Sequence, residues 1–429
     1  MKKISWRQKN FDTCMSELYR RPSYPHEIEA SVKEILEEVK RNGDAALVKY
    51  AKKFDGAKLS PASFAVSQAE IDAAAQKLDA SSKRAIATAL KNITQFARAT
   101  RPESRKFTPR KGVMTGERFE PLSRVGVYIP GGSAPLVSTV LHTAGLAHAA
   151  GVREIVAITP PGKTGAIAPA MLYALNKAGV SEIYRLGGVY GIAALAYGTK
   201  SIRKVEKIVG PGNAYVTAAK KLVFGEVAID MVAGPSEIMI LADRSARPDF
   251  IAADMLSQAE HGSGHEQAVL VSDCTKLLAM VEKELTSQAA ELTRSETVRR
   301  VLEKGVFLIE ARNMPHAAEL ASCYAPEHLE IICSKPEKTA ARVRAAGAMF
   351  LGQWTPEPVG DFTAGPSHVL PTAGSARFFS GLTVRDFYRR MSIIRYDEKA
   401  LRKEAGAIVK FAEMEGLDAH GKSASIRLK

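Results

Sequence analysis

Cysteine and tryptophan are scarce in this chain: 4 and 2 among 429 residues. The cysteines form no C-x-x-C pair and no regular spacing, which excludes a small disulfide-stapled domain and favours a reducing compartment. No stretch of about 18 or more apolar residues runs without a charge or a turn signal. The amino-terminal MKKISWRQKNFD has no apolar core of a signal peptide. These absences predict a cytoplasmic, soluble protein without a membrane span.

Charge of one sign is not concentrated anywhere, although the chain carries a net +14. The densest basic stretch, 101–111 (RPESRKFTPRK), is interrupted by Glu103. Since nucleic-acid sites need clustered Lys and Arg, we expect a solvated basic surface and no nucleic-acid partner. Hydrophobic content of 46% and charged content of 25% are typical of globular proteins, and the length allows roughly two to four domains.

Helical patterns dominate the first 100 residues. Apolar residues recur at helical spacing over 27–54 with a break near Gly43. Ser67 and Glu70 form a capping-box pattern that predicts a helix start.

Short β-branched runs alternate with helical runs from residue 124 onward, which predicts βαβ units and parallel sheets. A first series of runs lies at 124–130, 154–161, 182–188 and 206–212. A second series lies at 227–243, 268–273, 305–311, 328–333 and 347–352. The economical interpretation is two α/β units. A Gly- and Pro-rich stretch after Pro356 predicts a long functional loop or a domain edge.

Two glycine-rich turns, IPGGSAP (129–135) and VGPGNAYVTAAKK (209–221), each end a strand and open a helix. Such turns can present free N–H groups to an anion or nucleotide, or can be plain tight turns. The dinucleotide fingerprint G-x-G-x-x-G is absent.

Several His, Gln and carboxylate residues are candidates for chemistry. Gln258 and His261 are three apart on an expected helix that ends near Gly262; a pair of His261 with His265 would be the more conventional metal site, and a capping histidine is the simplest alternative. Glu327 and His328 stand at the entrance of a strand, where they are either a surface pair or a general acid–base pair.

Seven ordered motifs together resemble the L-histidinol dehydrogenases, a zinc-dependent family of histidine biosynthesis. They are VGVYIPGGSAPLVSTVL, GPGNAYVTAAK, IDMVAGPSEIMILAD, DMLSQAEHG, YAPEHLEI, VGDFTAGPSHVLPT and GLDAH. The resemblance implies oxidation of L-histidinol to L-histidine through L-histidinaldehyde with two NAD. It also implies one Zn²⁺ per subunit, held by Gln258, His261, Asp361 and His420 in place of the local preference for His265.

The resemblance assigns further roles. It implies that His328 is the general base and that Glu327 activates water for the second step. The residues it implies for substrate binding are Ser236, Gln258, His261, His328, Asp361, Glu415 and His420, and those for cofactor binding are Tyr128, Tyr190 and Asn213. Tyr190 stands where the family usually has Gln, and the helix after IPGGSAP departs from the usual pattern at His142, Leu146 and His148.

The fold implied is α/β, with two intertwined, incomplete Rossmann-like domains similar to aldehyde dehydrogenases and with small N- and C-terminal segments. We expect an N-terminal segment (1–25), a first domain with the zinc and catalytic residues (26–127 and 238–382), an NAD-binding domain (128–237) and a helical tail (383–429). The family forms homodimers in which the tail reaches the partner's site.

Other functions stay open from the sequence. A paralogue could use the same zinc and Glu-His pair to oxidise another primary alcohol, such as a dihydroxypropane sulfonate. An aldehyde dehydrogenase could use Cys323 or Cys333 as its nucleophile.

Overall fold

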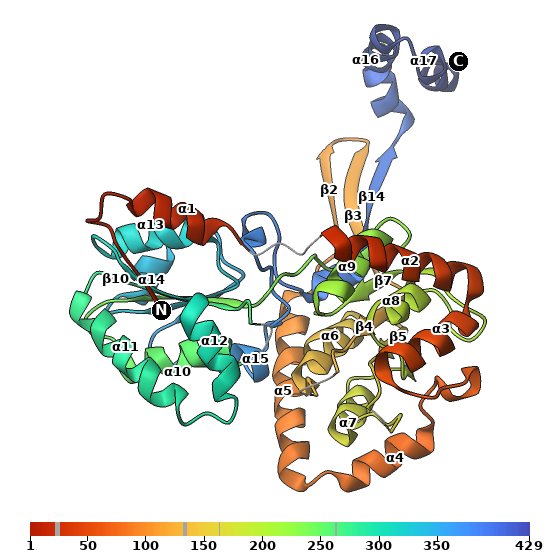
Figure 1. The fold of residues 1–429 in the computed structure, drawn as a ribbon. Helices are drawn as coiled ribbons and strands as arrows, with labels where there is room; N and C mark the ends of the chain where they lie inside the picture. The colour runs from red at the N-terminus through yellow and green to blue at the C-terminus, as the bar shows by residue number, and fades with distance from the viewer. Residues whose placement is uncertain (22–25, 132–134, 163, 262–263) are drawn as a thin grey trace.

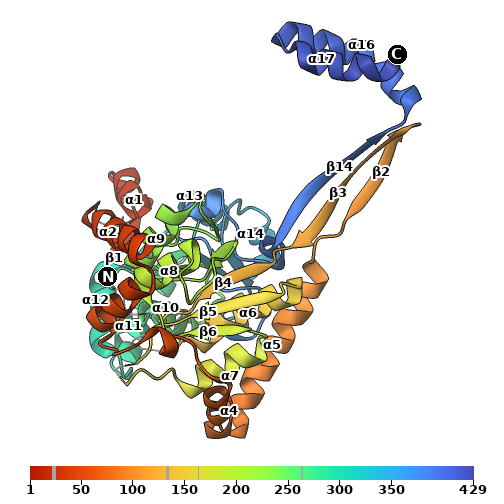
Figure 2. The same ribbon diagram turned by 90° about the vertical axis from the view of Figure 1, so that its right-hand side faces the viewer.

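The computed structural model describes residues 1–21, 26–131, 135–162, 164–261 and 264–429. These residues form two parallel α/β units side by side and an arm that leaves the body (Figures 1 and 2). The expected α/β class with two parallel sheets is confirmed. No helix among the described residues has the length and hydropathy needed to cross a bilayer.

The first unit, here called the six-stranded unit, has a wholly parallel sheet in the order β1-β11-β10-β9-β12-β13. Its strands are β1 (Lys2–Ser5), β9 (Glu237–Ala242), β10 (Gln267–Ser272), β11 (Val306–Glu310), β12 (His328–Ile332) and β13 (Ala348–Leu351). One face is covered by α10 (Pro248–Ala259), α11 (Thr275–Ala289) and α12 (Ser295–Lys304). The other is covered by α1 (Phe11–Tyr19), α13 (Met314–Tyr324) and α14 (Pro336–Ala340).

The second unit, the five-stranded unit, has the parallel order β6-β5-β4-β7-β8. Its strands are β4 (Arg124–Tyr128), β5 (Glu154–Ile158), β6 (Glu182–Tyr184), β7 (Lys207–Val209) and β8 (Ala228–Ile229). One face packs on α2 (His26–Asn42), α3 (Asp44–Tyr50), α8 (Gly188–Tyr197) and α9 (Ala214–Val223). The other packs on α4 (Gln68–Lys77), α5 (Ala80–Thr100), α6 (Val137–Ala150) and α7 (Pro169–Lys177).

The packing of residues 26–127 differs from the domain division expected from the sequence. The apolar face of α2 (Val32, Leu36, Val39) and that of α5 (Ile86, Ile93) join the cores of the five-stranded unit, not of the six-stranded one. The amino-terminal strand β1 instead pairs with β11 in the six-stranded sheet. The chain therefore starts in one unit, builds the other and returns, which is the expected intertwining with different boundaries.

Local signals in the sequence are confirmed where they were strongest. Ser67 caps α4 and Glu70 returns the capping-box hydrogen bond. Gly43 separates α2 from α3 with a positive φ of 49°. A π-helical turn (Ala51–Asp55) and short 3₁₀ turns (Pro61–Ser63, Ser375–Arg377, Val384–Phe387, Ile426–Leu428) complete the helical segments.

The arm is an antiparallel sheet of β2 (Arg105–Arg110), β3 (Val113–Pro121) and β14 (Tyr388–Tyr396), followed by α16 (Glu398–Glu415) and α17 (Asp418–Ser425). Asp397 caps α16 by accepting from the Ala400 amide, and Gly416 in the left-handed region ends it. Figure 2 shows the two helices held away from the body at the far end of this sheet.

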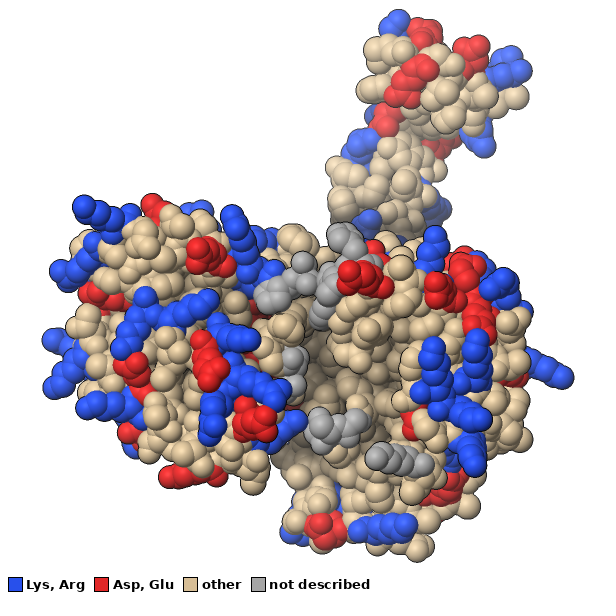
Figure 3. Space-filling model, in the orientation of Figure 1, with Lys and Arg blue, Asp and Glu red and all other residues tan. Residues whose placement is uncertain are grey.

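The edges of the two sheets that meet carry the functional candidates. Residues 230–236 lead from the carboxyl end of β8 to the amino end of β9. The carboxyl edge of the five-stranded sheet therefore adjoins the amino edge of the six-stranded sheet. On the face drawn in Figure 3, a hollow lies between the units, and basic side chains are scattered among acidic ones.

Candidate active site

Glu327 and His328 are both buried at the amino edge of the six-stranded sheet, where β12 begins. The Glu327 carboxylate accepts a hydrogen bond of 2.9 Å from the Glu237 amide of neighbouring β9. The Nδ1 atom of His328 lies 3.3 Å from the Glu237 carbonyl oxygen and 3.6 Å from the Glu327 carboxylate. The adjacent pair therefore reaches a single site, and a plain surface pair is excluded.

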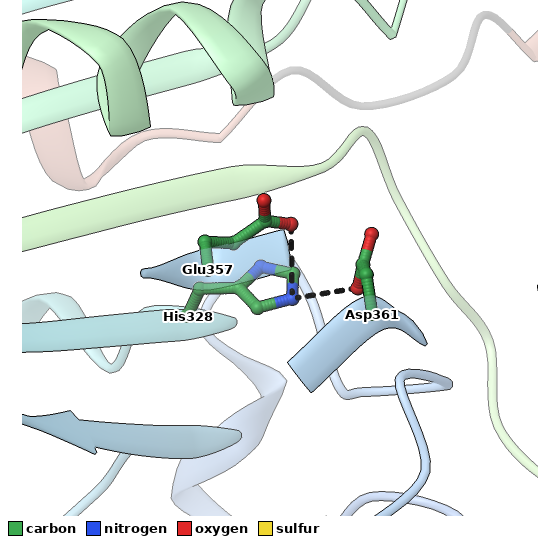
Figure 4. A group of neighbouring side chains, drawn as sticks. All are labelled: His328, Glu357 and Asp361. Atoms are coloured by element: carbon green, nitrogen blue, oxygen red, sulfur yellow. Dashed lines mark ion pairs between the residues drawn. The ribbon is translucent and has the colours of Figure 1, made fainter. Parts of the chain in front are cut away.

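The other ring nitrogen of His328 faces two carboxylates from α15 (Glu357–Phe362), as Figure 4 shows. Its Nε2 atom lies 3.9 Å from Glu357 and 3.7 Å from Asp361. The three side chains form a group whose ligand atoms lie within 4.8 Å of one another. Imidazole and carboxylate are donors that zinc accepts.

Glu357 is held in place by two elements. Its amide donates to Glu330 over 2.7 Å, and its carboxylate accepts 3.0 Å from the Ser257 hydroxyl on α10. The carboxyl of Asp254 on α10 is also buried and acts on the pKa of Glu330, raising it. This buried carboxyl pair lies between α10 and the strand that carries His328.

Gln258 and His261 lie at the carboxyl end of α10, which ends at Ala259. His261 is therefore beyond the helix and does not share a helical face with Gln258, while Gly262 lies outside the described residues. The two side chains still meet, since Gln258 Nε2 is 3.4 Å from His261 Nδ1. The charge of His261 acts on Asp361, which brings these three expected ligands into one region.

Asp361 also contacts His368, whose Nδ1 lies 3.6 Å from the same carboxylate oxygen that faces His328. The ring of His142 from α6 stacks on His368 with a centroid distance of 4.4 Å. The unusual helix after IPGGSAP therefore reaches the site at His142. His148, by contrast, is exposed on the same helix.

The carboxylate cluster shifts the pKa values of its members. Burial raises the pKa of Glu327 to about 8 and that of Glu357 to about 7, the latter helped by the Asp361 charge. Burial lowers the pKa of His328, but the carboxylates of Glu327, Asp361 and Glu357 outweigh it and raise that pKa to about 10. Burial raises the pKa of Asp361, but its ion pair with His328 and the nearby histidine charges hold it well below its usual range. Burial lowers the pKa values of His142 and His368.

The expected cofactor contacts lie at the carboxyl edge of the five-stranded sheet. Tyr128 ends β4, and Tyr190 on α8 is buried with its hydroxyl donating to Asp55. Asn213 caps α9, its side-chain oxygen accepting from the Tyr215 and Val216 amides over 3.1 Å each. The turn 209–213 is thus a capped strand-to-helix turn, whereas 132–134 of the other turn lie outside the described residues.

Two expected site residues are distant from this centre. Glu415 ends α16 and His420 lies on α17, both exposed at the end of the arm (Figure 2). Ser236 lies next to β9 at the correct edge of the six-stranded sheet, half-buried.

The two candidate cysteine nucleophiles do not join the site. Cys333 follows the carboxyl end of β12, the edge opposite to His328, and its sulfur contacts Thr339. Cys323 is exposed near the end of α13.

Sequence reasoning missed four side chains of the centre: Glu357, Glu330, Asp254 and His368. Nothing in their local pattern distinguishes them from solvated residues, although His368 stands in the quoted VGDFTAGPSHVLPT motif.

The fold and site define an α/β enzyme with a buried acid–base pair beside donors for a cation. Residues 18–428 match the family model of histidinol dehydrogenase. The histidinol dehydrogenase of Syntrophotalea carbinolica is 43% identical over 430 residues, covering 100% of this chain and 99% of the relative; that of Geobacillus kaustophilus is 45% identical, covering 93% of each. The crystal structure of histidinol dehydrogenase from Elizabethkingia anophelis superposes with a TM-score of 0.95 at 36% identity, covering 100% of this chain and 98% of that one. The chain belongs to the histidinol dehydrogenase family and is an oxidoreductase, which confirms the resemblance in the motifs.

Proposed function

We propose that the protein oxidises L-histidinol to L-histidine through L-histidinaldehyde, with two NAD and one Zn²⁺ per subunit. The observation that carries this proposal is the buried pair Glu327–His328 beside the carboxylate of Asp361. Membership of the histidinol dehydrogenase family supports the substrate.

The residues around His328 and Asp361 fit a zinc ion. Gln258 Oε1, His328 Nε2 and Glu357 Oε1 are buried without a hydrogen-bond partner among the described residues. A buried polar atom without a partner costs free energy, so such atoms indicate a missing ligand or ion. We propose Gln258, His261, Asp361 and His420 as the zinc ligands, which leaves His328 and Glu357 facing the substrate. Zinc, when bound, would hold the imidazole and amino groups of the substrate.

The carboxyl edge of the five-stranded sheet fits an anionic dinucleotide. Helices α6 and α8 both begin at this edge without a side-chain cap among the described residues, so the positive end of each helix faces the edge, although the Val137 amide of α6 already donates to the Pro135 carbonyl. We propose Tyr128, Tyr190 and Asn213 as cofactor contacts. NAD, when bound, would accept hydride from the substrate carbon.

In the first step, His328 Nε2 takes the hydroxyl proton of L-histidinol while the carbon loses hydride. Its acidic neighbours raise the pKa of His328, and a cation on Asp361 would oppose them, bringing the imidazole toward the range that suits a base. In the second step, Glu327 removes a proton from water, which adds to the aldehyde carbon. The product is the anion of the aldehyde hydrate, which loses hydride and its remaining hydroxyl proton to give the carboxylate.

In this proposal the active site is complete only in a homodimer, because the arm of one subunit contributes residues to the site of the other. Glu415 and His420 lie far from His328 in the same chain, and the arm exposes Phe411 and Met414 on α16 and Leu417 between α16 and α17. An exposed apolar patch of this kind indicates an interaction surface. We propose that each tail covers the partner subunit's site and supplies Glu415 as a substrate contact and His420 as the fourth ligand.

A comparison of substrates tests the proposed reaction. The zinc-loaded dimer should reduce NAD with L-histidinol at micromolar to millimolar concentration and not with a dihydroxypropane sulfonate. The reverse preference would assign the site to the paralogous reaction.

A further inference from the structure

Helix α6 of the five-stranded unit makes several side-chain contacts with the segment that carries His368. The Thr139 hydroxyl lies 3.3 Å from His368 Nε2, and the Ser367 hydroxyl donates to the His142 carbonyl over 3.1 Å. His142 and Thr139 are three residues apart, so both lie on the face of α6 that meets this segment. Together with the stack of His142 on His368, these two contacts fix the segment 367–368 to α6, and the adjacent Val369 joins the core of the same five-stranded unit.

His368 in turn contacts Asp361 in the catalytic centre, so its position affects that carboxylate. Its Nδ1 atom lies 3.6 Å from Asp361 Oδ1, and the same oxygen lies 3.7 Å from His328 Nε2. The carboxylate oxygen is thus placed between two imidazoles. A rotation of His368 would remove one of the two imidazoles that flank this oxygen.

His142 is a buried imidazole whose interactions converge on the site, because its ring stacks on His368 and the Asp361 charge acts on it. It is fully buried, and neither ring nitrogen has a hydrogen-bond partner among the described residues. Its main specific contact is the stack on His368, with 24° between the ring planes. An aromatic ring at this position restricts the rotation of the His368 ring in a way that an aliphatic side chain of similar volume does not.

We propose that His142 is a positioning residue, which by stacking on His368 holds Asp361 in the orientation that binds the metal and faces His328. The metal role of Asp361 rests on the proposed function. The contact network from α6 to Asp361 rests on the distances above.

The test compares four full-length dimeric variants: H142A, H142L, H142F and, as a matched control on the exposed side of the same helix, H148A. Affinity for Zn²⁺ alone is measured by competition with a chromophoric chelator, and kcat and KM for L-histidinol are then measured at saturating zinc. Thermal unfolding of each variant shows that it is folded.

H142A and H142L should bind zinc about tenfold or more weakly, as is usual when a residue supporting a metal ligand is lost. H142F, which keeps the stack, and H148A should stay within about twofold of wild type. Once zinc is saturating, the KM of H142L should recover more than its kcat, because Asp361 also orients His328.

Wild-type zinc affinity in H142L would overturn the proposal, because volume alone would then suffice. Weak binding by H142F would overturn it too, since the stack would not be the property that matters. These readings do not depend on the substrate: if the wild-type protein binds zinc but does not oxidise L-histidinol, the proposed function fails and the order of zinc affinities still decides the role of His142.

Discussion

His328 Nε2 and Asp361 Oδ1 lie 3.7 Å apart, so the proposed base and a proposed zinc ligand share one short contact. Their roles nevertheless separate by mutation. H328N removes the group that accepts the hydroxyl proton while leaving the four proposed ligands in place. We expect kcat to fall by about 10²–10⁴, the usual contribution of a general base, with zinc content unchanged. Metal analysis of the purified dimer alongside kinetics checks this, and loss of zinc from H328N would contradict the assignment.

If the subunits exchange tails, two inactive variants should restore activity when they form a mixed dimer. H328N and H420A should each be nearly inactive alone. In a mixed dimer with exchanged tails, the body with intact His328 receives the tail with intact His420. Subunits unfolded together, mixed in equal amounts and refolded should recover about a quarter of wild-type activity, because about half of random dimers are mixed and each has one complete site.

Refolded H328N and H420A alone are the controls for that experiment. If each tail instead completes the site of its own subunit, the refolded mixture should show no more activity than the two variants alone. That result would remove the proposed exchange while leaving the catalytic assignment of His328 untouched.

The buried pair Asp254–Glu330 should give the stability a pH dependence. Burial raises the pKa of Asp254 from its ordinary 3.8 to about 6. The folded state favours the protonated form of Asp254. Its contribution to the free energy of unfolding is therefore complete below about pH 4 and is lost as the pH rises to 6, by on the order of 1–3 kcal/mol. D254N replaces this carboxyl with an amide that does not titrate, so its stability relative to wild type should rise from pH 4 to pH 7.

Urea unfolding at several pH values measures that difference. D72N, an exposed substitution on α4, is the matched control and should run parallel to wild type throughout. A parallel course for D254N as well would show that Asp254 does not carry a raised pKa.

The Tyr190 hydroxyl donates to Asp55, which lies half-buried at the end of the π-helical turn. Y190F removes the donor and frees the Asp55 carboxylate at the edge where we place the cofactor. The freed carboxylate would repel an anionic dinucleotide, so the KM for NAD should rise at least severalfold, with little change in KM for L-histidinol. Y197F, on the same helix, is the control. Equal cofactor constants in Y190F and wild type would mean that Tyr190 and Asp55 do not serve the cofactor.

Strands were predictable from the sequence where they are fully buried. Runs such as EIVAI at β5 and EIMILA at β9 are continuous and apolar because helices cover both faces of a parallel sheet. The short edge strand β1 (KKIS) and the exposed strand β2 (RKFTPR) carry no such pattern, and both were missed. Assignment of the first helices to a unit also failed, because an apolar helix face does not specify which sheet it covers.

The candidate site was predictable only in part. Glu327 and His328 stand out because an acid–base pair enters an apolar strand, whereas Glu330 and Glu357 look like ordinary solvated residues along the chain. Their burial follows from the parallel register that sets β12 between β9 and β13 and from the return of α15 over that edge. Likewise, the sequence shows His142 only as a histidine within an apolar helix, and its contact with His368 is known only from the fold.

The most direct test of the proposed function is the stoichiometry of a limiting substrate. Wild-type dimer with Zn²⁺, excess NAD and a limiting amount of L-histidinol is followed by NADH absorbance, and L-histidine is quantified at the end point. Two NADH and one L-histidine per L-histidinol are expected, because His328 and Glu327 serve two successive oxidations at one site. No NADH, or one NADH with the aldehyde as the product, would contradict the account.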